Sequence, residues 1–237
     1  MRIGVFDSGV GGLNVLSCLM KKYPYNEYIY YGDSKNLPYG NKTKKELLQL
    51  ASSAIEFLIS KKVDIIIIAC GTISSTCYNI LKSKYSLPIY DIISSTIEYL
   101  KNSKFQNIGV IGTKRTIESR IFNIKGKNVI MHETPSFVPI IENNQIEEKK
   151  NDIVKELSIF KNADILVLGC THYPLLKNII EEYLNIPTLN MGEILANKLN
   201  IGKGKDYLCE LYFSSISTNL VINIEKILQM EYQIYLK

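Results

Sequence analysis

Asp64-Ile-Ile-Ile-Ile-Ala-Cys70-Gly-Thr72 is one of two stretches that decide the fold, and Asp164-Ile-Leu-Val-Leu-Gly-Cys170-Thr-His172 is the other. Each is a short apolar run that ends in a small residue and a cysteine. Such a run, bounded by polar residues, is typical of a buried strand in a parallel sheet. Ligands of parallel sheets bind beyond the carboxyl ends of the strands. The two stretches therefore predict two thiols that face one small substrate from opposite sides.

The similarity between the two halves extends beyond the cysteines. Residues 3–8 resemble residues 108–113, and residues 87–91 resemble residues 186–190, again about 100 positions apart. This period has the size of a domain rather than of a solenoid repeat. We favour a duplicated α/β lobe, and the alternative is that strand-like runs of any α/β protein can be aligned in this way.

Apolar runs alternate with helical patterns along the chain, which predicts βαβ units and mainly parallel sheets flanked by helices. We expect two pseudo-symmetric lobes with an active site between them: residues 1–96 with 207–237, and residues 97–206. The tail lacks a counterpart in the repeat and is expected to return to the first lobe, after a flexible break at 202–205. Strands are expected at 2–7, 28–32, 63–69, 87–91, 107–112, 127–131, 164–169, 186–190 and 209–214. Helices are expected near 12–21, 43–60, 73–84, 94–101, 114–121, 145–160, 174–184, 191–199 and 217–229.

The composition is that of an ordinary globular protein, with 46% hydrophobic and 22% charged residues among 237. No apolar run approaches the roughly 20 residues that span a bilayer, and the N-terminus does not resemble a signal peptide. We therefore expect a cytoplasmic protein without a membrane partner. The net charge is +5, but the lysines are scattered in pairs. They indicate solvated helix faces rather than a nucleic-acid site, although a mild positive field helps to attract an anionic substrate.

The five cysteines do not form a metal or disulfide framework. None of them belongs to a C-x-x-C pair, and the two histidines are not spaced as metal ligands with them. We expect no metal and no disulfide. Cys18, Cys77 and Cys209 lie in apolar helical or strand segments and are interpreted as small buried side chains.

The remaining candidates for chemistry surround the two repeated cysteines. Cys70 lies where a strand meets a helix, whose free N–H groups and positive dipole end lower the pKa of a thiol, and Cys170 has the matching position. Asp7-Ser8-Gly9-Val10-Gly11-Gly12 follows the first strand. Its glycines let amides approach an anion, but the spacing is neither G-x-G-x-x-G nor a P-loop, so a substrate carboxylate is the better fit. His172 can orient a substrate or tune Cys170, and the alternative is a structural histidine that caps a turn.

Together these motifs resemble the glutamate racemase family. The matching blocks are Ile3 to Leu13, Tyr31-Gly32-Asp33 with Leu37 to Lys42, Ala69 to Thr72, and Leu168 to Leu176, with weaker matches at 112–119 and 137–142. The resemblance runs from residue 1 to about 200. It implies cofactor-independent interconversion of L- and D-glutamate, which supplies D-glutamate for peptidoglycan, the polymer that builds the cell wall and fixes cell shape.

The resemblance also implies roles for particular residues. Cys70 and Cys170 correspond to the two acid/base thiols, the first acting on the D-enantiomer and the second on the L-enantiomer. Asp7, Glu142 and His172 correspond to groups that support the thiols. The expected substrate-binding positions are Asp7, Ser8, Pro38, Tyr39, Gly40, Gly71, Thr72, Thr113, Thr116, Thr171 and His172.

The chain departs from the family pattern beside the first cysteine. Gly71 replaces an asparagine whose side chain binds substrate in the family, and we expect a water molecule to take its place. Asn190-Met191 and Thr134-Pro135 also differ from the family's Asp-Ser and Cys-Pro. Because of Gly71, racemisation of aspartate or another acidic amino acid is the alternative activity. A non-catalytic amino-acid-binding or regulatory protein is a further alternative, and a homodimer is a candidate assembly.

Overall fold

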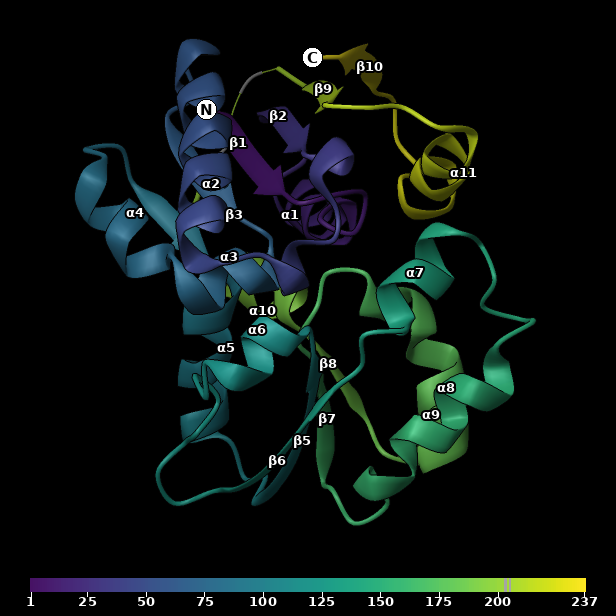
Figure 1. The fold of residues 1–237 in the computed structure, drawn as a ribbon. Helices are drawn as coiled ribbons and strands as arrows, with labels where there is room; N and C mark the ends of the chain where they lie inside the picture. Colours follow the sequence, from purple (N-terminus) through teal and green to yellow (C-terminus); the bar gives the residue numbers. More distant parts are fainter. Residues whose placement is uncertain (203, 205) are drawn as a thin grey trace.

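Two parallel β-sheets, stacked end to end with helices around them, form the computed structural model of the chain (Figure 1). The structure describes residues 1–202, 204 and 206–237, so Lys203 and Lys205 of the expected flexible break lie outside the described residues. The strands of the larger sheet are β1 (Arg2–Asp7), β2 (Glu27–Gly32), β3 (Ile65–Ile68), β4 (Ile89–Asp91), β9 (Leu208–Phe213) and β10 (Gln233–Leu236). Those of the smaller sheet are β5 (Asn107–Gly112), β6 (Asn128–Glu133), β7 (Ile165–Leu168) and β8 (Thr188–Asn190).

The two sheets repeat one strand order. The first contains β2-β1-β3-β4 and the second β6-β5-β7-β8, with all these pairs parallel. The register repeats as well, because Ile3 lies opposite Ile65 in the first sheet and Ile108 lies opposite Ile165 in the second. This confirms the predicted α/β fold class and is the arrangement expected of a duplicated lobe.

The tail returns to the first sheet. Strand β9 pairs with β2, and β10 adds outside β9 at the edge of the sheet. Strand β10 was not predicted from the sequence. Its four residues are all exposed, and a strand without a buried face does not need the alternation of apolar and polar residues by which a half-buried strand is recognised. Helix α11 (Thr218–Ile227) lies between these two strands in sequence and contacts α7 (Phe137–Glu142) across the molecule, as Figure 1 shows.

Most predicted helices are present, with shorter or shifted bounds. They are α1 (Leu13–Lys22), α2 (Lys44–Ser60), α5 (Ile92–Asn102), α6 (Lys114–Glu118), α8 (Lys150–Leu157), α9 (Lys177–Leu184) and α10 (Met191–Lys198), with α9 preceded by a 3₁₀ turn at Tyr173–Leu176. The predicted helix at 73–84 is instead divided at Cys77 into α3 (Gly71–Thr76) and α4 (Tyr78–Lys84). The hydroxyls of Ser75 and Thr76 bond back to the carbonyl of Thr72, and such back-bonding bends helices.

The structure contains a helix, α7, in a segment where neither a helix nor a strand was expected from the sequence. Helix α7 begins at Phe137 and includes Pro139 in its first turn, where the missing N–H of proline costs no hydrogen bond. This helix carries Glu142, so the difference bears on the site.

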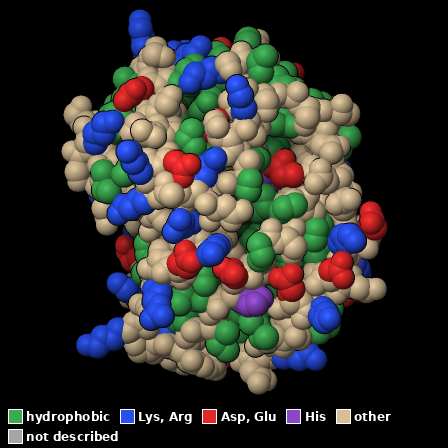
Figure 2. Space-filling model, in the orientation of Figure 1, with side chains coloured by type: hydrophobic (Ala, Val, Ile, Leu, Met, Phe, Trp, Pro, Cys, Tyr) green, Lys and Arg blue, Asp and Glu red, His purple; other side chains and the backbone are tan. Residues whose placement is uncertain are grey.

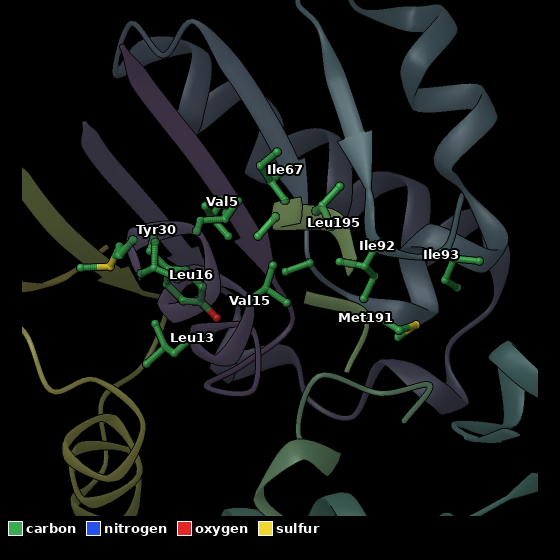
Figure 3. Close-up of a cluster of buried hydrophobic side chains, with 14 of the residues drawn as sticks. Val5, Leu13, Val15, Leu16, Tyr30, Ile67, Ile92, Ile93, Met191 and Leu195 are labelled. Carbon is green, nitrogen blue, oxygen red and sulfur yellow. The ribbon is translucent and has the colours of Figure 1, made fainter. Parts of the chain in front are cut away.

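One buried cluster joins the two halves of the chain. Val15 and Leu16 of α1, Ile92 of α5, and Met191 and Leu195 of α10 all belong to it (Figure 3). The division of the chain at residues 96 and 206 remains a prediction, because this cluster contains residues from both sides of it. The shared core places the carboxyl ends of β3 and β7 in a fixed relation.

The surface carries mixed charge. Figure 2 shows basic side chains at many separate places on one face, with acidic side chains between them. Within the part of the chain that the structure describes, no helix has both the length and the apolar character needed to cross a bilayer.

Candidate active site

The carboxyl ends of β3 and β7 bring the two repeated cysteines to one cavity. Cys70 follows β3 after one residue and caps α3, and Cys170 follows β7 in the same way. Both side chains are buried, at 3% and 7% exposure. The cavity measures about 120 Å³, which is room for several water molecules or one small metabolite.

Most residues predicted for substrate binding line this cavity. They are Ser8, Pro38, Tyr39, Gly40, Gly71, Thr72, Thr113, Thr171 and His172. Asp7, Thr116 and Glu142 do not line it and lie behind residues that do. The sequence reasoning missed Leu37, Asn41, Lys114, Thr134, Pro135, Val138 and Pro139, which also line the cavity. Several of these residues are next to predicted positions in the sequence, and this was a signal that could have identified them.

The surroundings of Cys70 favour the neutral thiol. Its Sγ lies 3.6 Å from Ser8 Oγ. Burial raises the pKa of the Cys70 thiol to about 12, the negative charge of Asp7 adds to this, and the N–H of Ile73 and the hydroxyl of Ser8 oppose it. The helix N-terminus lowers this pKa through the N–H of Ile73, as expected, but the net shift is upward because the loss of hydration outweighs it.

Cys170 belongs to a chain of three side chains. Its Sγ lies 3.6 Å from Nδ1 of His172, and Nε2 of His172 donates to Oε1 of Glu142 at 2.6 Å. Burial lowers the pKa of His172, but its bonds to Cys170 and Glu142 outweigh burial and raise the pKa well above its usual value. Burial raises the pKa of Glu142, and the bond to His172 outweighs it and lowers that pKa. The pair is thus a carboxylate and an imidazolium, and the positive charge lies beside Cys170.

Asp7 acts through the backbone and through Thr171. Its Oδ2 accepts from the N–H groups of Gly9 at 3.0 Å and Gly12 at 3.1 Å, and its Oδ1 accepts from Thr171 Oγ1 at 3.2 Å. Burial raises the pKa of Asp7, while His172 and these three donors oppose the rise. Asp7 therefore shapes the loop after β1 and orients the hydroxyl of Thr171.

Three threonine hydroxyls also link the two halves of the site. Oγ1 of Thr72 lies 3.0 Å from Oγ1 of Thr113, which lies 3.1 Å from Oγ1 of Thr116. Thr113 also caps α6 by accepting from the N–H of Thr116. Thr116 is fully buried and reaches the cavity through Thr113.

The loop at 37–41 covers the cavity. The bond between Leu37 and Pro38 is cis, and the hydroxyl of Tyr39 donates to buried Asp33 at 2.7 Å. This bond fixes the ring of Tyr39 at the wall of the cavity.

The described residues contain no cluster of three or more His, Cys, Asp or Glu side chains that could bind a metal ion, and all five cysteines are free thiols. Two thiols that line one cavity can transfer protons to and from a small molecule bound between them.

Comparison with known proteins agrees with this geometry. Residues 24–199 match the model of the Asp/Glu/Hydantoin racemase family. The chain is 38% identical to a glutamate racemase of Hydrogenobaculum sp. over 99% of this chain and 95% of that protein. It is 43% identical to a glutamate racemase of Thermoanaerobacter pseudethanolicus over 87% and 80%.

A solved structure gives the same result. The structure of glutamate racemase from Francisella tularensis in complex with D-glutamate is 32% identical and superimposes with a TM-score of 0.87, covering 100% of this chain and 96% of that one. The chain therefore belongs to the Asp/Glu/Hydantoin racemase family and, within it, to the glutamate racemases.

Proposed function

We propose that this protein interconverts L- and D-glutamate by a two-base reaction, with Cys70 and Cys170 as the catalytic residues. The observation that carries the proposal is that the two thiols, from separate sheets, line one small cavity. Inversion at a carbon atom requires a base on one face and an acid on the other, and this placement supplies both.

The reaction balances without a further reactant. The thiolate of one cysteine takes the α-proton, so that the C–H bond breaks and an S–H bond forms. The electron pair left on the α-carbon is delocalised toward the carboxylate, and the thiol of the other cysteine then delivers its proton to the opposite face. Cys170 acts as the base on L-glutamate and Cys70 as the base on D-glutamate.

The surrounding groups make this proton transfer feasible. An α-proton beside a carboxylate is only weakly acidic, so the base must be close, oriented and desolvated. Both thiols are buried, and His172 supplies a positive charge beside Cys170. Ser8, Thr72 and Thr171 line the cavity, and we propose that their hydroxyls bind the substrate carboxylates, where negative charge grows as the carbanion forms.

An isotope experiment tests the activity. We expect the protein to incorporate deuterium at the α-carbon of both enantiomers of glutamate in deuterated water, with loss of optical rotation. Exchange with aspartate but not with glutamate would contradict the proposed substrate and favour the alternative acidic amino acid. Binding of glutamate without any exchange would indicate a non-catalytic relative.

Substitution of the cysteines tests the mechanism. We expect C70S and C170S each to abolish racemisation, because a serine hydroxyl is far less acidic than a thiol. C209S is the matched control, since Cys209 is also buried but lies in β9, away from the cavity. Full activity of either C70S or C170S is incompatible with the two-base scheme.

The wider role follows from the activity. We propose that the product D-glutamate is used for peptidoglycan synthesis and that the protein works in the cytoplasm. A homodimer remains a prediction, which sedimentation of the purified protein tests directly.

A further inference from the structure

Gly71 and Gly169 are in contact between the two halves of the active site. Gly71 directly follows Cys70, and Gly169 directly precedes Cys170. A Cβ atom placed on Gly71 would lie 2.5 Å from the carbonyl oxygen of Gly169, and the next nearest atoms, the Gly169 carbonyl carbon and Cys170 Cα, are also backbone. Backbone atoms cannot swing aside as a flexible side chain does. The expectation that water fills the place of a side chain at Gly71 is therefore wrong, because the Gly169 carbonyl occupies it.

The carbonyl of Gly169 is fixed by its own sheet. The N–H of Gly169 donates to the carbonyls of Ile111 at 2.8 Å and Val167 at 3.1 Å. A Cβ on Gly169 would itself lie 2.4 Å from the oxygen of Ile111, so this segment is packed directly against β5. This packing and these hydrogen bonds resist a displacement of the Gly169 carbonyl away from Gly71.

The segment around Cys70 is fixed as well. The N–H of Ala69 donates to the carbonyl of Phe6 at 2.8 Å, and the N–H of Ser74 donates to the carbonyl of Cys70 at 2.9 Å. These bonds hold Cys70 and Gly71 to β1 and to α3. A side chain on Gly71 would therefore be accommodated mainly by separation of the two lobes.

Other bonds across the same joint keep the lobes together. Thr72 and Thr113 share a hydrogen bond of 3.0 Å, and Asn14 Nδ2 donates to the carbonyl of Thr171 at 2.8 Å. Thr72 lies two residues after Cys70, and Thr171 directly follows Cys170. The contact between Gly71 and Gly169 thus belongs to a short series of links that fixes the distance between the two strand ends.

We propose that Gly71 is a positioning residue that sets the spacing of the Cys70 and Cys170 thiols. This inference rests on the proposed two-thiol function. Ordinary van der Waals contact begins at 3.4 Å, so even a methyl group at Gly71 requires the joint to open by about 1 Å. Each thiol must reach the same α-carbon from opposite faces, and an opening of this size moves at least one of them out of line. A displacement of about 1 Å can reduce a rate on the order of 100-fold.

Two substitutions at Gly71 and one control test the proposal. We expect G71A to lower kcat/KM on the order of 10- to 100-fold in both directions, mainly through kcat, because the spacing acts on proton transfer. We expect G71N to lower it at least as much, although asparagine is the residue of the family pattern. G202A is the matched control, since a Cβ on Gly202 has no neighbour within 4 Å. If G71A or G71N is as active as the wild type, the proposal is wrong.

A cross-linking measurement reports the spacing without relying on turnover. A short bis-alkylating reagent should join Cys70 to Cys170 in the wild-type active site and do so several-fold less efficiently in G71A. The background for this experiment replaces the other cysteines with alanine: Cys18, Cys77 and Cys209. Equal cross-linking in G71A overturns the proposal, whereas absence of glutamate exchange in the wild type overturns only the proposed function.

The folding of the variant is part of the test. The backbone bonds on each side of the joint lie within a single lobe, so we expect G71A to fold and to show a circular dichroism spectrum like that of the wild type. Failure of G71A to fold would also overturn the proposal, because it would mean that the strain is not relieved by opening of the lobes.

Discussion

The ion pair between Glu142 and His172 is expected to contribute to stability and activity across the neutral pH range, and E142Q tests this. The two side chains are 20% and 2% exposed, and their oxygen and nitrogen lie 2.6 Å apart. Glutamine keeps an oxygen in this place but removes the charge. A hydrogen bond to a charged group contributes roughly 1.5–3 kcal/mol and a neutral one roughly 0.5–1.5 kcal/mol. E142Q should therefore lower the free energy of unfolding by about 1–1.5 kcal/mol, and an equal loss in the transition state lowers kcat/KM about 5- to 10-fold.

The pH dependence follows from the directions of the two pKa shifts. The folded pKa of Glu142 is lowered, so its contribution is present above the unfolded value of about 4.3 and is lost as the pH falls through the folded pKa. The folded pKa of His172 is raised, so its contribution is complete below the unfolded value of about 6.5 and is lost as the pH rises through the folded pKa. The wild-type pair therefore contributes across the neutral range.

As the pH rises, E142Q should lose stability at a lower pH than the wild type does. Without the negative charge of Glu142 the pKa of His172 falls, so the alkaline limb of both stability and kcat/KM moves to lower pH. Urea unfolding and racemisation, each followed from about pH 4 to about pH 9, measure the two limbs. E56Q is the matched control, because Glu56 pairs with Lys84 at 3.6 Å on the exposed surface and should change stability by less than about 0.5 kcal/mol. Alkaline limbs of E142Q that coincide with those of the wild type would refute the reasoning.

Three further substitutions test other contacts of the site. T72V removes the 3.0 Å bond to Thr113 and should reduce the free energy of unfolding in urea by roughly 0.5–1.5 kcal/mol; unchanged stability would show that this bond does not tie the lobes together. Y39F removes the 2.7 Å hydrogen bond to buried Asp33, which keeps Asn36 as a donor, so we expect a loss of roughly 0.5–1.5 kcal/mol in the same assay and a higher KM; an unaltered KM would show that this ring takes no part in substrate binding. N223A removes a buried amide that donates at 3.5 Å to carbonyls at the end of α7 and should lower kcat/KM a few-fold, measured by polarimetry; wild-type activity would exclude α11 as a support of Glu142.

The strands could be predicted from the sequence because their physical signal is local. Runs such as Ile65–Ile68 and Ile165–Leu168 are buried on both faces, and few other structures place four apolar residues in succession. Edge strand β10 has no such burial and was missed. Helix α7 was also missed, because the prolines around it are common in loops as well as in first helical turns.

The candidate site was predictable only in part, because its partners come from distant parts of the chain. The motif around Cys170 pointed to His172 two residues away, but the bond from His172 to Glu142 spans 30 positions and no spacing rule connects them. Glu142 was named through a resemblance to a family. The contact between Gly71 and Gly169 had no sequence signal at all, since it depends on how the two lobes pack.

The two thiols occupy equivalent backbone positions, but their surroundings differ. Cys70 has a hydroxyl neighbour and a pKa raised by burial and by Asp7, so it rests as the neutral thiol. Sγ of Cys170 instead lies 3.6 Å from Nδ1 of His172, whose pKa is raised by its bonds to Cys170 and Glu142. In the proposed reaction the neutral thiol of Cys70 donates the proton when L-glutamate is the substrate. For the reverse reaction the thiolate must form at Cys70, and the substrate contributes to this, because its ammonium group brings a positive charge into a cavity of low dielectric. Removal of the negative charge of Asp7 should therefore favour the thiolate at Cys70. D7N is then expected to lower the pH at which D-glutamate begins to exchange its α-proton, and an unchanged onset would separate Asp7 from the ionisation of Cys70.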